Sequence, residues 1–381
     1  MKRVEIYDTT LRDGEQAPGA AMRKHEKLAI AEALQALCVD TVEAGFPMAS
    51  VDDANAVSEI ARTCKDIRIA AFARTQTEDI ESAAAALKHA VRPRISLVMP
   101  VSELHVKTKL RLDAEGAIER LADCVRVARN LCPDVEVIAE DASRATRDFL
   151  ARAARTAMAC GAGTITIADT VGYATPFDIT ELFAGLYQDV PGLREISLGI
   201  HCHDDLGLAT INTLTGLAAG ASQAHCTING LGERAGNAAL EEVVMAMRVR
   251  QDRFAMQCDV QASRLWEISR LVSRVTSFPV PPNKAIVGGN AYAHGSGMHQ
   301  DGMLKASDTY EIIPPESVGA PARHMPITRH SGRKGLAARL QEMGVMLDEE
   351  QTLRLLDLVK SRLGDAPVLS DSEIRDLLRL L

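Results

Sequence analysis

Short apolar runs, rich in β-branched residues, recur along the first part of the chain and are typical of buried strands. We expect eight strands, at Val4 to Tyr7, Thr41 to Ala44, Ile67 to Phe72, Arg94 to Val98, Val135 to Ala139, Thr164 to Ala168, Ile196 to Cys202 and Ala224 to Ile228. Between them lie stretches with helical spacing, among them Glu26 to Leu37, Asp79 to Ala90, Ala114 to Asn130 and Arg147 to Ala159. This alternation predicts parallel strands joined by helical crossovers, an α/β fold.

Polar residues lie at or just after the carboxyl ends of most predicted strands. Asp13 follows the first strand, Glu43 ends the second, Glu140 follows the fifth, and a run from His201 to Asp205 closes the seventh. Enzymes built on (β/α)8 barrels keep their catalytic residues at this end. Together with the count of eight, this placement favours a closed (β/α)8 TIM barrel over an open doubly wound sheet.

The alternation of strands and helices ends near Arg250. A helical stretch from Val260 to Thr276 follows, and then a segment rich in glycine and proline, which marks irregular backbone. The residues from Gly335 to Leu381 again have helical spacing. We expect three parts: a barrel over 1–255, a linker with a first subdomain over 256–330, and a small helical subdomain over 331–381.

Composition narrows the class of protein. Hydrophobic residues make up 46% and charged residues 25%, an ordinary globular balance, and no apolar run has the ~20 residues of a membrane span. The N-terminus turns polar before any secretory h-region develops, so we expect a cytoplasmic protein. The 8 cysteines form no CxxC pair, which argues against a disulfide framework. A net charge of −8 without a basic run predicts a small-molecule partner, not nucleic acid or a membrane.

The strongest candidate for chemistry is the sequence His201-Cys202-His203 at the end of the seventh strand. Residues two apart in a strand face the same side, so both imidazoles can point into the barrel mouth as metal ligands. Asp13 can complete the site, because barrel closure brings the first, seventh and eighth strands together. A carboxylate with two imidazoles suits Mn²⁺, Mg²⁺ or Zn²⁺. Ordinary hydrogen bonding of two histidines is the alternative.

Two further motifs surround this predicted metal site. Arg12 next to Asp13 pairs a cation that can polarise a carbonyl oxygen with a metal-binding carboxylate, although an Arg-Asp pair in a loop is more often a plain salt bridge. After the eighth strand, the glycine-rich run from Asn229 to Glu242 contains Glu233 and Asn237 and opens a helix. Such a loop allows a ligand to approach the backbone closely, and it can also be a structural turn.

Several motifs resemble those of one enzyme family. DTTLRDGEQAPG, EAGFP, AEDASR, ADTVGYATP, HCHDDLGLAT and NGLGERAGNAALEE match in order the acetyl-CoA-dependent 2-isopropylmalate synthases and homocitrate synthases, which are metal-dependent barrels. The later NKAIVGGNAYAHGSGMHQDGMLK, TYEIIPPESVG and RHSGRKGL resemble the 2-isopropylmalate synthase type. The resemblance covers nearly the whole chain. It implies an acyltransferase that joins the acetyl group of acetyl-CoA to a 2-oxo acid and gives a 2-alkylmalate.

The resemblance also implies roles for individual residues. The divalent metal would be held by Asp13, His201, His203 and Asn237, and it would chelate the carboxylate and keto oxygens of the oxo acid. Arg12 would support the keto oxygen as it becomes an alkoxide. Thr170 would grip the carboxylate, and Glu140 would line the same site.

A base must remove a proton from the acetyl methyl group. By resemblance this base is His299, supplied across the interface of a domain-swapped homodimer, with Glu233 holding or relaying the proton and Tyr310 nearby. Because His299 lies outside the predicted barrel, the sequence permits this arrangement. A histidine in a surface loop is the alternative.

The chain departs from the family in two respects. It ends soon after the helical region, so we expect a short form without the leucine-binding regulatory domain. The residues expected to touch the oxo-acid side chain also differ, because Ser96 replaces a common histidine and Ala168 a common proline. The full set of these pocket residues is Phe72, Ser96, Leu97, Val98, Ile138 and Ala168.

These pocket residues carry no positive charge, and a second carboxylate buried without a partner costs several kcal/mol. We therefore expect an apolar 2-oxo acid, branched, extended or aromatic. The alternative is a homocitrate synthase that uses 2-oxoglutarate, for which His105, Lys107 or Arg74 would have to reach the second carboxylate. A retro-aldol lyase and an inactive barrel scaffold are further alternatives, and the presence of every metal and base residue argues against the scaffold.

Overall fold

A computed structural model describes the chain over residues 1–328, 330–362 and 368–381. These residues form two compact units, Met1–Val280 and Pro281–Leu381.

Eight parallel strands close into a barrel in the first unit, with the last strand paired to the first. The strands are β2 (Glu5–Asp8), β3 (Thr41–Glu43), β4 (Arg68–Arg74), β5 (Pro93–Pro100), β6 (Val135–Glu140), β7 (Thr164–Asp169), β8 (Ser197–Cys202) and β9 (Gln223–Cys226). The predicted (β/α)8 barrel and each of its eight strands are confirmed. Two short strands, β1 (Lys2–Arg3) and β10 (Met256–Gln257), pair in a separate sheet.

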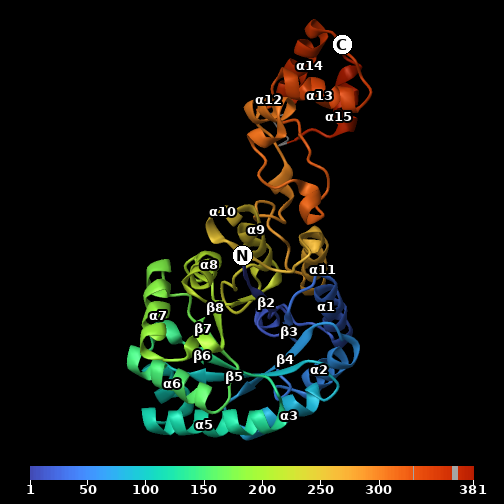
Figure 1. The fold of residues 1–381 in the computed structure, drawn as a ribbon. Helices are drawn as coiled ribbons and strands as arrows, with labels where there is room; N and C mark the ends of the chain where they lie inside the picture. Colours follow the sequence, from blue (N-terminus) through green and yellow to red (C-terminus); the bar gives the residue numbers. More distant parts are fainter. Residues whose placement is uncertain (329, 363–367) are drawn as a thin grey trace. The chain divides into compact units, whose positions relative to one another are not determined.

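Helices surround the strands (Figure 1). They are α1 (Lys24–Ala36), α2 (Val51–Thr63), α3 (Thr77–Leu87), α5 (Ala114–Leu131), α6 (Arg147–Ala159), α7 (Pro176–Asp189), α8 (Ala209–Ala219) and α9 (Leu240–Val249). Capping residues set several starts: Thr175 and Asp178 form a capping box at α7, with Pro176 as its first residue. A later helix, α11 (Leu265–Thr276), packs against α1. Within the described ranges, no helix is both long and apolar enough to cross a bilayer.

Polar side chains fill the middle of the barrel interior, where branched aliphatic residues are common in other barrels. Ser96, Glu136 and Thr166 are fully buried and face inward from β5, β6 and β7. Residues two apart on a strand share a face, so each lies one layer below the next inward residue. These next residues, nearer the mouth, are Val98, Ile138 and Ala168.

Glu136 is the centre of this polar layer. Its carboxylate accepts hydrogen bonds from Ser96 (2.9 Å) and Gln223 (2.7 Å), and its Oε1 lies 3.0 Å from Nε2 of His225. Burial alone would raise the pKa of Glu136, but His225 and Arg94 outweigh that effect and hold the pKa well below its usual range. The layer therefore contains an ionised carboxylate whose partners compensate for its burial.

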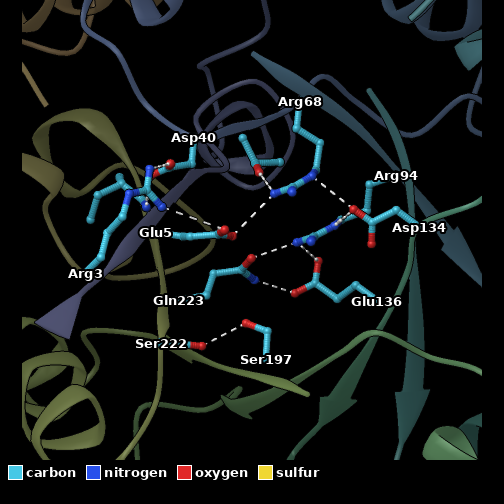
Figure 2. Close-up of polar contacts among 12 residues, drawn as sticks. Arg3, Glu5, Asp40, Arg68, Arg94, Asp134, Glu136, Ser197, Ser222 and Gln223 are labelled. Atoms are coloured by element: carbon cyan, nitrogen blue, oxygen red, sulfur yellow. Dashed lines mark hydrogen bonds and ion pairs between the residues drawn. The ribbon is translucent and has the colours of Figure 1, made fainter. Parts of the chain in front are cut away.

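A line of alternating charges continues from Glu136 toward the amino-terminal ends of the strands (Figure 2). Arg94 lies 3.9 Å from Glu136 and 3.0 Å from Asp134. Arg68 then bridges Asp134 at 3.0 Å and Glu5 at 3.3 Å. Because each charge has an opposite partner, the desolvation cost of this polar interior is offset.

The loop after β2 is tied to the segment after β9. Asp8 is fully buried and accepts two hydrogen bonds from Thr10, from the backbone N–H (2.9 Å) and from the hydroxyl (3.0 Å). The Thr10 hydroxyl in turn accepts the N–H of Ile228 at 2.9 Å. Burial raises the pKa of Asp8 to about 7. This anchor fixes the start of the loop that carries Arg12 and Asp13.

The second unit is mostly helical, as the sequence predicts. Its helices are α12 (Gly297–Lys305), α13 (Arg333–Glu342), α14 (Glu349–Arg362) and α15 (Asp371–Leu378). An apolar cluster joins the last three helices and consists of Ile327, Leu336, Leu340, Leu355, Leu356, Val359, Leu369 and Ile374. Helix α12 lies outside this cluster and begins at the irregular, glycine-rich segment.

The buried Asp8 predicts a pH-dependent stability. Its folded pKa, about 7, lies above the usual value of 3.8, so folding favours the protonated form. The stabilising contribution is therefore complete below about pH 3.8 and is lost as the pH rises through about 7. We expect Asp8→Asn to gain stability over wild type, by up to a few kcal/mol, across this window. Urea unfolding at a series of pH values measures the difference.

The exposed Asp123→Asn is a matched control for this measurement, since its side chain is 76% accessible. Its difference from wild type should stay nearly constant across the same pH range. If the Asp8→Asn difference were equally constant, the proposed link between burial of Asp8 and stability would be wrong.

Candidate functional site

Two histidines and one aspartate bring their side chains together at the carboxyl ends of the strands. His201 is the second-last residue of β8 and His203 directly follows the strand, and their Nε2 atoms lie 3.2 Å apart. Oδ2 of Asp13 lies 3.8 Å from Nε2 of His201 and 3.7 Å from Nε2 of His203. All three residues are buried, and their ligand atoms lie within 4.8 Å of one another. The structure thus gathers the three residues that the sequence pattern selected.

The chemistry of these three side chains fits a divalent cation. Burial, and then the neighbouring His203, lower the pKa of His201 well below its usual value, so the imidazole is neutral and can donate a lone pair. Burial would raise the pKa of Asp13, but Arg12 and both histidines outweigh that and hold it below its usual range. Burial also lowers the pKa of His203. Two neutral imidazoles and a carboxylate form a donor set for a divalent metal. Oδ1 of Asn237 is also buried and has no hydrogen-bond partner among the described residues.

Arg12 is fixed beside Asp13. Its guanidinium donates to Oδ2 of Asp13 at 2.8 Å and to Oε2 of Glu43 at 2.7 Å, and it lies 4.8 Å from the ring centre of Phe72. The salt bridge that the sequence left as an alternative is therefore present. Arg12 also lines the cavity described below, so it is positioned to contact a ligand there.

The glycine-rich loop after β9 packs on Asp13. The backbone N–H of Glu233 (3.1 Å) and the side-chain amide of Asn237 (2.7 Å) both donate to Oδ1 of Asp13. A Cβ atom on Gly232 would lie 2.0 Å from Nδ2 of Asn237, and one on Gly236 would lie 2.0 Å from a backbone oxygen. These two glycines therefore allow the loop to pack closely around Asp13. The sequence had suggested instead that they allow a ligand to approach the backbone.

A cavity of about 280 Å³ opens beside these residues. The predicted site residues that line it are Arg12, Asp13, Phe72, Val98, Ile138, Glu140, Ala168, Thr170, His201, His203 and Glu233. The wall formed by Phe72, Val98, Ile138 and Ala168 is apolar. The cavity therefore combines a polar group of candidate metal ligands with an apolar wall.

Two residues expected in the side-chain pocket lie elsewhere. Ser96 is fully buried in the polar layer, where its hydroxyl contacts the hydroxyl of Tyr7 at 3.0 Å and donates to Glu136. Leu97 is also fully buried, and neither residue lines the cavity. Register explains the difference, because Ser96 is one layer below Val98 and Leu97 faces the opposite side of the strand.

Lys109 lines the cavity, although no sequence motif singled it out. It forms an ion pair with Oε1 of Glu140, which His105 approaches to 3.4 Å. Lys109 lies in a single π-helical turn, Val106–Leu110, where side-chain directions do not follow the spacing of an ordinary helix. Lys107 and Arg74 were the other residues expected to reach a second carboxylate, and neither lines this cavity. Lys107 lines a separate groove, and Arg74 pairs with Asp79 at 2.8 Å.

Gln16 and Arg234 also line the cavity without having been selected from the sequence. Gln16 accepts a hydrogen bond from Arg12 at 3.3 Å, and Arg234 pairs with Asp205 at 2.7 Å. Gln16 lies in the motif DTTLRDGEQAPG and Arg234 in the motif NGLGERAGNAALEE, so position within these motifs was the available signal.

His299 and Tyr310 belong to the second unit. His299 lies on α12, and its ring stacks on that of Tyr310 with 3.9 Å between centroids and 16° between planes. Both side chains are exposed. The structure therefore brings these two predicted residues together with each other.

Comparison with protein families decides where the chain belongs. The sequence model described as HMGL-like matches residues 3–272, which is most of the chain. The chain belongs to the HMGL-like family. A second model, described as homocitrate synthase post-HMGL domain-like, matches residues 286–366 of this HMGL-like chain.

Curated relatives of the chain carry the name 2-isopropylmalate synthase. The chain is 49% identical over 351 residues to a 2-isopropylmalate synthase of Carboxydothermus hydrogenoformans, covering 92% of this chain and 69% of that protein. For the enzyme of the same name from Aquifex aeolicus, the identity is 47% over 378 residues, with 99% and 73% covered. For that from Caulobacter sp. it is 49% over 346 residues, with 91% and 66% covered. The chain thus spans roughly two thirds of the length of these relatives.

Solved structures agree with the fold. HMG-CoA lyase from Brucella melitensis is 22% identical with a TM-score of 0.63, covering 73% of this chain and 100% of that one. Hydroxymethylglutaryl-CoA lyase from Pseudomonas aeruginosa is 20% identical with a TM-score of 0.63, covering 73% and 95%. At these identities the likeness shows the HMGL-like barrel fold alone.

The buried cluster predicts metal binding that depends on His203. Changing even residues behind metal ligands weakens binding about 10- to 100-fold, so loss of a ligand should weaken it at least as much. We expect His203→Ala to bind Mn²⁺ at least tenfold more weakly than wild type in calorimetric titration. His25→Ala, an exposed histidine on α1, is the control and should bind like wild type. Equal Mn²⁺ affinity in all three proteins would contradict the metal centre.

Proposed function

We propose that this chain condenses acetyl-CoA with an apolar 2-oxo acid to give a 2-alkylmalate and free CoA, as a 2-isopropylmalate synthase does. The observation that carries the proposal is the buried group of Asp13, His201 and His203 that opens on a cavity with an apolar wall. The name shared by relatives with 47% to 49% identity supports it. Because the chain matches only part of each relative, the activity of the whole protein is part of the proposal.

The first step is binding and activation of the oxo acid. A divalent ion held by Asp13, His201 and His203, with Asn237 beside them, would supply Lewis-acid polarisation of the keto group. The Arg12 guanidinium, fixed by Glu43, offers a positive charge for the oxygen that becomes an alkoxide. Thr170 and Glu140 line the same cavity, where Thr170 would hold the substrate carboxylate. The predicted ion is Mn²⁺, Mg²⁺ or Zn²⁺.

The second step removes a proton from the acetyl methyl group. We assign removal of this proton to His299, on which the ring of Tyr310 stacks. Glu233, which lines the cavity, would hold or relay the proton. The electron pair of the broken C–H bond forms a bond to the keto carbon, and the resulting alkoxide takes up a proton. Water then cleaves the thioester, which releases CoA as the thiol. The domain-swapped homodimer and the cytoplasmic location expected from the sequence stay predictions.

The cavity wall bears on the choice of oxo acid. The apolar wall of the cavity offers a substrate side chain no charged partner; it consists of Phe72, Val98, Ile138 and Ala168. In the polar layer below this wall, Ser96 and Thr166 donate their hydrogen bonds to Glu136. A carboxylate placed against this wall would lose its hydration without compensation. An apolar side chain would instead gain from burial.

Lys109 favours a second candidate, homocitrate synthase. It is a cation at the cavity, and it could turn from Glu140 toward the second carboxylate of 2-oxoglutarate. In the structure the charge of Lys109 is already paired with Glu140, so a dicarboxylate would have to break this ion pair. We therefore keep the apolar oxo acid as the main proposal.

A panel of 2-oxo acids tests the substrate class. We expect 2-oxoisovalerate or another apolar oxo acid to react with a kcat/KM more than tenfold above that of 2-oxoglutarate, because an unpaired carboxylate costs more than the ~1.4 kcal/mol of a factor of ten. Release of the CoA thiol in the presence of Mn²⁺ measures the rates.

Two variants test for a homocitrate synthase if the panel shows a preference for 2-oxoglutarate. Lys109→Gln should lose turnover of 2-oxoglutarate if Lys109 binds the second carboxylate, whereas Lys107→Gln, outside this cavity, should not. A wild-type preference for 2-oxoglutarate that Lys109→Gln abolishes would replace the main proposal with homocitrate synthase.

The role of His299 predicts a separation of binding from turnover. His299→Ala should lower kcat by roughly 10²- to 10⁴-fold, the range of general acid or base catalysis, and leave the affinity for the oxo acid nearly unchanged. Steady-state kinetics and calorimetric binding of the oxo acid measure the two quantities. The exposed His89→Ala is the control. If His299→Ala instead lost oxo-acid affinity and kept its kcat, the assignment of the base would be wrong.

A further inference from the structure

His299 and Tyr310 form a stacked pair on an exposed part of the second unit. Their ring centroids are 3.9 Å apart and the rings are within 16° of parallel. Tyr310 is 41% accessible, and His299 is exposed as well, so the pair is not held together by a surrounding core. The local backbone must therefore set the contact between the two rings.

The residue that allows this contact is Gly302. It lies three positions after His299 on α12, so both residues are on the same side of the helix. A Cβ atom on Gly302 would lie 2.6 Å from Cε2 of Tyr310 and 3.1 Å from Cγ2 of Thr309. The first distance is shorter than any ordinary carbon contact, so a side chain at this position would push the Tyr310 ring away.

Glycine inside a helix is unfavourable relative to alanine, so its presence in α12 needs a reason. Gly302 does not have a positive φ, which means that its backbone conformation does not require glycine. The remaining reason for glycine at position 302 is that the ring of Tyr310 occupies the space that a side chain there would need.

The opposite side of α12 is anchored, so the helix itself holds its place within the unit. Gln300 is fully buried, and its amide donates to the carbonyl oxygens of His294 (2.8 Å) and Pro326 (3.1 Å). Asp301 of the same helix also forms an ion pair with Lys334 of α13. With the helix fixed in this way, the remaining freedom of His299 is rotation of its side chain, and the stacked tyrosine restricts that rotation.

We propose that Gly302 is a positioning residue for the reaction: by leaving room for the ring of Tyr310, it fixes the orientation of the His299 imidazole that takes the acetyl proton. This inference rests on the proposed function. A base acts only when its nitrogen is directed at the proton, and a displacement of about 1 Å can cost on the order of 100-fold in rate.

The test compares Gly302→Ala with Gly289→Ala in the full chain. Gly289 lies in the same unit and has no positive φ, and a Cβ atom there would meet nothing within 4 Å. We expect Gly302→Ala to lower kcat by roughly 10- to 100-fold with the KM for the oxo acid within about twofold of wild type. Gly289→Ala should behave like wild type.

Proton NMR of His299 gives a readout that does not depend on activity. Stacking on Tyr310 shifts the imidazole Cε1–H resonance upfield, and His299→Ala identifies the signal. We expect Gly302→Ala to remove this upfield shift and Gly289→Ala to keep it. If Gly302→Ala kept the shift and still lost kcat, or lost the shift and kept its kcat, the inference would be overturned.

A double-mutant cycle separates positioning from damage to the fold. Tyr310→Ala removes the ring that Gly302 makes room for, so adding Gly302→Ala to Tyr310→Ala should cause no further loss of kcat. An equal loss in both backgrounds would show that alanine at this position disturbs the helix itself, and it would overturn the inference. Absence of thiol release from the wild type with every oxo acid is a different result, which would reject the proposed function.

Discussion

Asp13 is the residue on which the arrangement of the candidate active site depends. Its carboxylate accepts hydrogen bonds from Arg12 on one oxygen and from Asn237 and the Glu233 backbone on the other. It thereby joins the loop after β2 to the loop after β9, and it faces His201 and His203 at the end of β8. These contacts keep the carboxylate ionised despite its burial. Without this charge, the two neutral imidazoles would have no anionic partner with which to hold a cation.

The polar layer inside the barrel supports the same site from below. Glu136 and its partners fill the level where aliphatic side chains would otherwise pack, and the ring of His225 meets that of His201 edge-on, with 5.5 Å between centroids. Gly199 makes the layer possible, because a Cβ atom there would lie 2.1 Å from the Thr166 hydroxyl. The cavity therefore has an apolar wall directly above a closed polar layer. This sequence of layers limits how far a substrate side chain can extend into the barrel.

Much of this could be read from the sequence because it depends on local patterns. The eight strands follow from their apolar runs, and the approach of Asp13 to His201 and His203 follows from barrel closure. The depth of each inward side chain depends on strand register across the whole barrel, which no local pattern contains. For that reason Ser96 was expected in the pocket and lies one layer below it. Lys109 was missed because a single π-helical turn determines which lysine of that segment reaches the cavity.

The reaction proposed for this site forms a carbon–carbon bond between the acetyl group and a 2-oxo acid. The most direct measurement is ¹³C NMR of the product formed from acetyl-CoA labelled at the methyl carbon, with 2-oxoisovalerate and Mn²⁺ present. We expect the label to appear in a CH₂ group attached to a carbon that carries a hydroxyl and a carboxylate, with one CoA thiol released for each product molecule. Label found only in free acetate, with no new carbon–carbon bond for any 2-oxo acid tested, would contradict it.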